Sequence, residues 1–182
     1  GGYNANIVAL IDSCYLGTIY EKEFSQLYAG QFNIRKKKIE SRKIELESGG
    51  YIQVFFSPQS NTVERAVIPL LKKAQETINI PIFYLTHDQI FEALKQAQSE
   101  GVKIKVILDA TAAENEYVLD EQLREAGIPI KVETWPGKMH MKVAIIDNKH
   151  LITGSMNFTK AGNSKNDENT VILWNVPELA KP

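Results

Sequence analysis

Residues 139–157 read Met-His-Met-Lys-Val-Ala-Ile-Ile-Asp-Asn-Lys-His-Leu-Ile-Thr-Gly-Ser-Met-Asn. Within this stretch, residues 139–146 and 150–153 are largely apolar, and they flank the polar residues Asp-Asn-Lys at 147–149. Two strand-like runs around such turn residues are typical of paired strands joined by a tight turn. The stretch therefore predicts a hairpin-like unit in the C-terminal part of the chain.

Strand-like and helix-like segments alternate on the N-terminal side of this hairpin. Strand patterns occur there at residues 51–56, 77–85, 102–108 and 128–133, and helix patterns occur at 62–76, 86–99 and 115–126. A last strand pattern follows the hairpin at 171–174. Strands that alternate with helices are typical of α/β proteins. We therefore predict an α/β fold with a mixed, largely parallel β-sheet flanked by helices on both faces.

The first 50 residues carry different patterns. Residues 6–11 (Asn-Ile-Val-Ala-Leu-Ile) predict a short buried strand, and the spacing of apolar residues at 14–28 predicts a helix. A basic stretch that begins with Arg-Lys-Lys-Lys at 35–38 then runs to a Gly-Gly pair at 49–50. This stretch is typical of a solvated connector, and a contact with a phosphate backbone is the alternative.

Residues 6–12 and 169–175 resemble each other, because asparagine, valine and leucine recur at the same offsets and a strand leads into a helix in both. If this is a repeat, residues 1–30 are the tail of a preceding copy of one domain. Residues 31–50 are then the basic connector, and residues 51–182 are the catalytic domain. The chain also starts without a methionine, so we expect it to be a piece of a longer protein.

The composition excludes several classes of protein. The 182 residues are 43% hydrophobic and 24% charged, which is typical of a globular protein and not of a disordered one. The net charge of −1 means that a nucleic acid would be bound through local patches and not through bulk charge. No apolar run approaches the roughly 20 residues that span a bilayer, and no signal-peptide pattern occurs, which favours the cytoplasm without fixing the compartment.

The residues that bind metals in proteins are sparse. Cys14 is the single cysteine, so the chain can form no internal disulfide and has no cysteine-based metal site. The three histidines, His87, His140 and His150, are too scattered to form a metal site. We therefore expect neither a metal nor a cofactor.

The hairpin and the residues after it carry groups that suit a phosphate. His140 and Lys142 are two positions apart on a predicted strand, so their side chains should share a face. Ser155 and Asn157 follow Gly154, where a glycine allows a tight bend and a close approach of a ligand. The lysine and the neutral donors can hold phosphate oxygens, while the imidazole can attack or transfer a proton.

In this pattern the chain resembles the phospholipase D superfamily. Six positions match the superfamily signature in spacing: His140, Lys142, Asp147, Gly154, Ser155 and Asn157. Asn-Asp-Glu-Asn at 166–169 resembles the downstream acidic element of the same family. The resemblance extends over residues 51–180 and is nearest to the bacterial phospholipase D-like nucleases.

The resemblance implies a hydrolase that cleaves phosphodiesters in two steps without a metal. His140 would attack phosphorus and form a phosphohistidine, and a second histidine would protonate the leaving oxygen and later activate water. Lys142 and Asn157 would bind the non-bridging oxygens and stabilise the charge of the transition state. Ser155 would donate to the same phosphate or fix its loop.

Four further residues complete the implied site. Glu168 would accept a hydrogen bond from the other ring nitrogen of His140 and so set its tautomer. Asp147 belongs to the catalytic motif, and in the family it more often supports the site than touches substrate. Trp135 and Lys138 precede the motif on a loop, which either packs against the edge of the sheet or forms a cleft wall, through base stacking and a phosphate contact.

The chain has one copy of a motif that the family uses in pairs. Two chains can supply the pair in a homodimer, with the motifs meeting at the two-fold axis. The other route is an upstream repeat of the same protein, which the likeness between residues 6–12 and 169–175 favours. In either case we expect no membrane span.

The predicted function is hydrolysis of nucleic acid by an endonuclease, with DNA favoured over RNA. Family likeness, size and the lack of a strongly basic amphipathic helix favour nucleic acid over lipid. Two alternatives stay open. One is a phospholipase D-type phospholipid hydrolase or phosphatidyl transferase, and the other is a half-site that binds phosphate without turnover.

Overall fold

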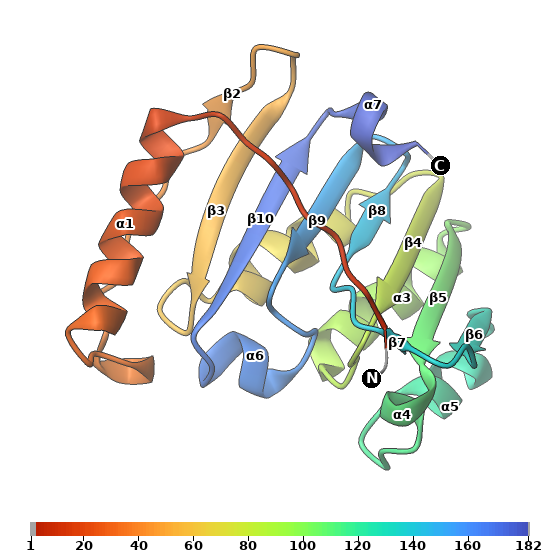
Figure 1. Cartoon of the computed structure of the whole chain (residues 1–182). Coiled ribbons are helices and arrows are strands. Elements are labelled where there is room, and N and C mark those ends of the chain that lie inside the picture. The colour runs from red at the N-terminus through yellow and green to blue at the C-terminus, as the bar shows by residue number, and fades with distance from the viewer. Residues whose placement is uncertain (1–2, 182) are drawn as a thin grey trace.

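An eight-stranded mixed sheet forms the middle of the molecule in a computed structural model that describes residues 3–181 (Figure 1). In chain order its strands are β2 (Ile44–Glu45), β3 (Tyr51–Ser57), β4 (Thr77–Ile82), β5 (Lys103–Asp109), β6 (Ile130–Glu133), β8 (Ala144–Ile146), β9 (His150–Gly154) and β10 (Glu168–Trp174). In space their order is β2-β3-β10-β9-β8-β4-β5-β6. Outside this sheet, β1 (Asn4–Ala5) pairs in parallel with β7 (Lys138–Met139).

Helices connect the strands and cover the sheet. They are α1 (Cys14–Tyr28), the 3-10 turn η1 (Asn33–Arg35), the π-helical turn η2 (Val63–Val67), α2 (Ile68–Leu71), α3 (Asp88–Ser99), α4 (Ala110–Ala113), α5 (Asp120–Glu125), α6 (Lys160–Ser164) and α7 (Pro177–Ala180). The α/β class and the mixed sheet are therefore confirmed.

Parallel pairing covers a smaller share of the sheet than the sequence predicts. The pairs β4–β5 and β5–β6 are parallel, because α3 and the α4–α5 segment return the chain to the same edge before each new strand. The other five pairs, β2–β3, β3–β10, β10–β9, β9–β8 and β8–β4, are antiparallel. They are so because β8 and β9 form a hairpin and β10 folds back between β9 and β3.

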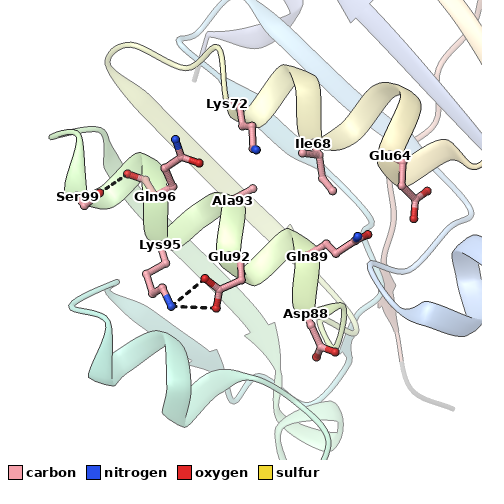
Figure 2. Close-up of a pocket in the computed structure, with 10 residues that line it drawn as sticks. All are labelled: Glu64, Ile68, Lys72, Asp88, Gln89, Glu92, Ala93, Lys95, Gln96 and Ser99. Carbon is pink, nitrogen blue, oxygen red and sulfur yellow. Dashed lines mark hydrogen bonds and ion pairs between the residues drawn. The ribbon is translucent and has the colours of Figure 1, made fainter.

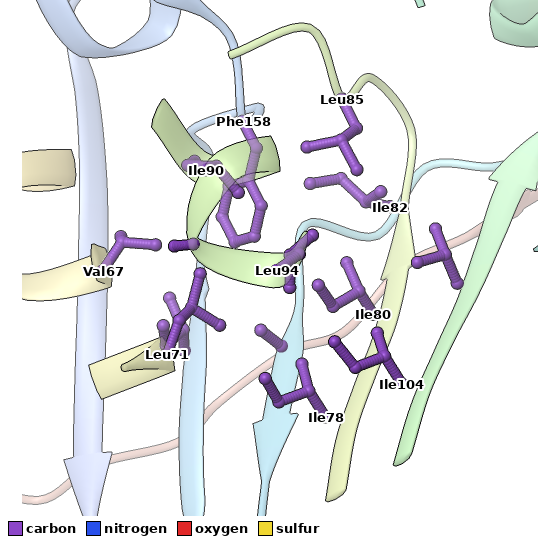
Figure 3. Packing of buried hydrophobic residues seen from close by; sticks show 14 of the residues in the cluster. Val67, Leu71, Ile78, Ile80, Ile82, Leu85, Ile90, Leu94, Ile104 and Phe158 are labelled. Carbon is purple, nitrogen blue, oxygen red and sulfur yellow. The ribbon is translucent and has the colours of Figure 1, made fainter. Parts of the chain in front are cut away.

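One face of the sheet carries the larger hydrophobic core. Ile78, Ile80 and Ile82 alternate along β4 toward this face, where Leu94 of α3 and Leu71 of α2 meet them (Figure 3). All five side chains are essentially excluded from solvent. Burial of this kind contributes about 25 cal/mol for each Å² of apolar surface removed from water. The core therefore fixes β4, whose C-terminal end leads to the site described below.

A smaller core covers the opposite face. Leu16 and Ile19 of α1 pack on Val54 and Phe56 of β3 and on Val171 of β10. Helices therefore lie on both faces, as predicted. The contact also shows that α1 packs against the sheet of residues 51–182.

The predicted buried strand at residues 6–11 is wrong. These residues form no strand, and Val8 and Leu10 are 81% and 95% exposed. Figure 1 shows the segment crossing the face of the sheet toward α1, in front of the strands. An apolar run forms a strand only where a neighbouring strand offers hydrogen bonds, and beyond β1 none does so here.

Three other predicted elements differ from the structure. The helix predicted at 62–76 ends at Leu71, and the helix predicted at 115–126 is shortened to α5, with α4 forming before the predicted range. The strand predicted at 139–146 is interrupted between β7 and β8. Val143 donates to the carbonyl of Pro81 on β4, and a proline has no N–H to donate in return, which accounts for the break.

Candidate functional site

Three of the predicted site residues line one cavity beside the C-terminal end of β4. Its volume is about 230 Å³, and its walls are Asn6, Ile7, His140, Met141, Lys142, Gly154 and Ser155. His140 and Lys142 share this cavity although they lie in the irregular segment between β7 and β8 and not on a regular strand. Ser155 reaches it from the loop after β9.

His140 is held from two sides. Its backbone N–H donates to the carbonyl of Ala5 at 3.0 Å, and its Nδ1 lies 3.3 Å from Oδ1 of Asn6. The ring of Phe83 packs edge-on against the imidazole, with 4.9 Å between the ring centroids. Partial burial, followed by the charge of Lys142, lowers the pKa of His140 below its ordinary value of 6.5, so the ring is neutral near pH 7.

Lys142 is almost fully buried beneath the histidine. Its Nζ donates to the backbone carbonyl of His140 at 2.8 Å and lies 5.0 Å from the centroid of the Phe83 ring. Burial lowers the pKa of Lys142 to about 8, and the carboxylates of Glu168 and Asp109 act in the opposite direction. Near pH 7 the site therefore combines a neutral imidazole with an ammonium group that has few protein partners.

Ser155 is tied to the loop that carries Glu168. Its hydroxyl donates to Oε2 of Glu168 and accepts from the backbone N–H of Asn169 at 3.0 Å. The other carboxylate oxygen of Glu168 accepts from the side chain of Asn166 at 3.2 Å. The implied bond between Glu168 and His140 is absent from this structure, where Asn6 is the partner of the histidine Nδ1.

Gly154 is required by the geometry of this corner. Its φ is +144°, and a Cβ at this position would lie 2.3 Å from the carbonyl oxygen of Asn169. A side chain would therefore push β9 away from β10 and displace Ser155.

Asn157 does not line the cavity. Its Oδ1 accepts a hydrogen bond from the backbone N–H of Tyr84 at 3.3 Å, directly after Phe83. Asn157 thus joins the loop after β9 to the segment after β4.

Asp147 lies far from the cavity, so the structure corrects its place among the catalytic residues. Its carboxylate accepts from the backbone N–H groups of Gln75, Glu76 and Thr77 at 2.8 to 3.2 Å. Burial alone would raise the pKa of Asp147, but these hydrogen bonds outweigh it and lower the pKa. Thr77 begins β4 and Phe83 follows its end, a separation of roughly 20 Å along a strand. We therefore expect a structural role for Asp147.

Asp147→Ala is expected to lower the free energy of unfolding by about 2 to 3 kcal/mol, because three amides lose their acceptor and a non-glycine residue keeps a positive φ. Asp147→Asn keeps one acceptor oxygen and should cost less. In both variants kcat of the folded protein should stay within about twofold of wild type. Urea unfolding and steady-state kinetics test this, and a large loss of kcat at unchanged stability would overturn the structural role.

The two candidates for a cleft wall differ in position. Lys138 places its Nζ 5.8 Å from the centroid of the Phe83 ring, beside the site. Trp135 is 37% exposed, and its ring packs on its own loop, where a Cβ on Gly137 would lie 2.6 Å from it. Trp135 does not line the cavity.

Sequence reasoning missed three residues around the site. Phe83 lies half-buried beside both His140 and Lys142. Asp109 accepts from the backbone N–H of Met139 at 2.8 Å and so fixes the residue before the histidine, besides capping α4. Asn6 comes from the far N-terminus. Phe83 and Asp109 lie at the C-terminal ends of β4 and β5, which is the edge where ligands bind in open α/β sheets. Their position at the ends of predicted strands could therefore have identified them as site candidates.

A larger cavity, of about 690 Å³, lies elsewhere in the molecule. Figure 2 shows it between the η2–α2 segment and α3, with Ile68, Lys72 and Ala93 among its walls. Two of its charged residues, Lys95 and Glu92, form an ion pair at 2.9 Å. No histidine or cysteine lines it, so the smaller cavity at His140 is the better candidate for chemistry.

Two further observations concern the whole described chain. Among residues 3–181 no group of three or more histidine, cysteine, aspartate or glutamate side chains is placed to hold a metal ion. None of the helices in that range combines the length and the apolar character needed to cross a bilayer.

The mixed α/β sheet and the His140–Lys142 cavity together fit the phosphodiesterase class of proteins. Residues 67–182 match the family described as "Cardiolipin synthase, PLD-like domain". The chain therefore belongs to the phospholipase D superfamily.

Similar proteins agree with this membership. The chain is 34% identical over 122 residues to a protein named Phospholipase D from Rickettsia typhi, covering 67% of this chain and 59% of that protein. It is 30% identical over 115 residues to the human protein named Mitochondrial cardiolipin hydrolase, covering 63% of this chain and 46% of that protein. The chain thus spans between about half and two thirds of the length of these two relatives.

Solved structures show the same fold. The phospholipase D family member Nuc from Salmonella typhimurium superposes with a TM-score of 0.66 at 33% identity, covering 71% of this chain and 86% of Nuc. NucT from Helicobacter pylori gives a TM-score of 0.64 at 27% identity, covering 71% of this chain and 87% of NucT. The alignment with Nuc covers most of both chains.

Proposed function

We propose that this chain forms the catalytic part of a phosphodiesterase that hydrolyses nucleic acid, acting as a DNA endonuclease through a covalent phosphohistidine and without a metal. One observation carries the proposal: a neutral imidazole, a buried ammonium and a hydroxyl line one cavity at His140, Lys142 and Ser155. This set supplies a nucleophile and two donors for a phosphate.

In the first step Nε2 of His140 attacks phosphorus. A hydrogen on Nδ1 donated to Asn6 leaves the lone pair on Nε2 free for this attack. A phosphorus–nitrogen bond forms while the phosphorus–oxygen bond to the leaving group breaks, and the leaving oxygen takes a proton from the histidine of a second motif, which enters the reaction as an imidazolium. In the second step that histidine takes a proton from water, whose oxygen attacks phosphorus and releases His140.

The other residues stabilise the negative charge that develops on the phosphoryl oxygens. Lys142 supplies a full positive charge at low local dielectric, where its effect is large. Ser155 supplies a hydroxyl donor. Asn157 does not line the cavity, but its Nδ2 is the donor it can offer to a phosphate that extends beyond the cavity, because its Oδ1 already accepts from the backbone of Tyr84.

The surroundings of the cavity support a nucleic acid as substrate. The half-buried ring of Phe83 lies beside the nucleophile, and Lys138 lies over the same ring. An aromatic face next to a cation suits a base and its phosphate. Such contacts read the backbone and stacking more than the sequence of bases, so we expect low sequence specificity.

A second motif must complete the site, and we propose that it comes from a second copy of the chain or from an upstream repeat. The exposed apolar side chains of Val8 and Leu10 support the upstream repeat, since they would be buried if residues 6–11 paired with strands of a preceding domain. For the chain by itself, a homodimer with two copies of His140 is the arrangement that can turn over.

A phospholipid is the second candidate substrate. The names of the relatives, Phospholipase D and Mitochondrial cardiolipin hydrolase, favour it. The reaction at phosphorus would be the same, with a lipid headgroup as the leaving group.

One assay separates these candidates. We expect the chain to cleave labelled single- or double-stranded DNA in the presence of EDTA, with activity per chain rising with protein concentration as dimers form. Cardiolipin and phosphatidylcholine vesicles serve as the parallel substrates. Release of phosphatidic acid with no cleavage of DNA would reject the nuclease and support the lipid enzyme, while binding of DNA without turnover would leave only the non-catalytic half-site.

A further inference from the structure

One lysine of the basic connector is buried, against the expectation of a solvated segment. The side chain of Lys36 is fully excluded from solvent. Its Nζ forms ion pairs with Glu23 of α1 and, at 2.9 Å, with Asp167, and it donates to the carbonyl of Ser57 at 3.0 Å. A single ammonium group thus joins α1, the end of β3 and the loop before β10.

A neighbouring residue binds the same loop. The backbone N–H of Asn33 donates to Asp167 at 2.8 Å, and its side-chain amide donates to the same carboxylate at 3.2 Å and to the carbonyl of Lys165 at 2.7 Å. Residues 33–36 therefore hold the loop at 165–167 through four contacts, which are three hydrogen bonds from Asn33 and the ion pair between Lys36 and Asp167.

This loop leads directly into the site. Glu168 follows Asp167 in the chain, and its carboxylate accepts from Ser155, which lines the cavity. The charge of Glu168 also acts on Lys142. A displacement of the loop would therefore move one wall of the cavity and one of the charges that act on its ammonium group.

We propose that Lys36 is a positioning residue for the phosphodiesterase site, because its contact with Asp167 fixes the loop that places Glu168 and Ser155. The kinetic part of this inference rests on the proposed function.

Stability alone is a weak explanation for such an arrangement. A buried ion triad often contributes no more than well-packed apolar residues of the same volume, because three charges lose their hydration. What the triad does provide is a fixed geometry between segments that are 131 residues apart in sequence, at positions 36 and 167. That geometry is what a site built partly on a loop requires.

The test compares Lys36→Met with Lys37→Met, its exposed neighbour on the same connector. Hydrogen–deuterium exchange of residues 164–170 reports on the loop without any substrate. We expect exchange of the Asn169 amide, which donates to Ser155, to accelerate at least about tenfold in Lys36→Met and to stay unchanged in Lys37→Met. Unchanged exchange in Lys36→Met would overturn the proposal, whatever the activity.

Kinetics with bis(p-nitrophenyl) phosphate then test the positioning role. We expect Lys36→Met to lower kcat at least about tenfold with KM within about twofold, and to shift the alkaline limb of kcat/KM to lower pH as Glu168 moves away from Lys142. A loosened loop with unchanged kcat and pH profile would reduce Lys36 to a structural residue. If wild type hydrolyses no phosphodiester, the proposed function fails while the exchange result still decides whether Lys36 holds the loop.

Two further variants guard against a folding defect. Asp167→Asn removes one charge but keeps an oxygen that can accept from Lys36 and Asn33, so it should fold and show a smaller loss of kcat. Lys36→Arg keeps the charge and should recover part of the kcat lost in Lys36→Met. If Lys36 and Asp167 act as one unit, their combined variant should lose less kcat than the product of the two single losses. Independent losses would contradict the proposal.

Discussion

His140→Ala is expected to lower kcat for phosphodiester hydrolysis by a factor of at least about 10⁴, because the variant lacks the group that forms the covalent bond to phosphorus. The fold should be preserved, since the imidazole makes one hydrogen bond, to Asn6, and otherwise packs on Phe83. Rates with bis(p-nitrophenyl) phosphate and with DNA, both in EDTA, measure the loss. Thermal unfolding checks that the variant is folded.

His150→Ala is the matched control, because His150 lies on β9, where its Nδ1 accepts from the backbone of Asn175. Its kcat should stay within about threefold of wild type. Rapid acid quenching followed by mass spectrometry should find phosphoryl adducts on peptides that contain His140. Activity that survives in His140→Ala, or that requires an added metal, would refute the mechanism.

Much of the fold could be predicted because it depends on local patterns. The helix expected at 14–28 is α1, and the strand expected at 51–56 is β3 with one added residue. Apolar periodicity and flanking glycines are local signals, and the tertiary structure did not override them here. The segment at 6–11 failed for the opposite reason, since a strand depends on a partner that the run itself does not reveal.

The residues of the candidate site likewise fall into those that local sequence patterns predict and those that they do not. His140, Lys142 and Ser155 could be predicted together because they lie within 16 residues of one another on a hairpin and its following loop. Contacts of Phe83 and Lys36 depend on the packing of distant segments, which no spacing in the sequence encodes. Asp147 matches the spacing of the superfamily signature but lies away from the cavity. The hairpin turn that carries it is at the opposite end of β8 from His140.

Replacing Lys142 should have the second largest effect. Lys142→Met is expected to lower kcat by a factor of about 10² to 10³, the usual cost of losing one donor to a transition-state anion. Methionine has nearly the length of the lysine side chain and fits a buried position, so the fold should tolerate it. Lys149→Met, exposed at the tip of the same hairpin, is the matched control and should keep the wild-type kcat.

The pH dependence of kcat/KM shows whether Lys142 acts as a cation. Its pKa of about 8 means that the free enzyme carries the charge below pH 8 and loses it above, so kcat/KM should fall as the pH rises through about 8. Lys142→Arg stays charged throughout this range, so whatever activity it retains should lack that fall. A decline near pH 8 that persists unchanged in Lys142→Arg would mean that another group titrates there. The ammonium charge would then not be the contribution of Lys142 to catalysis.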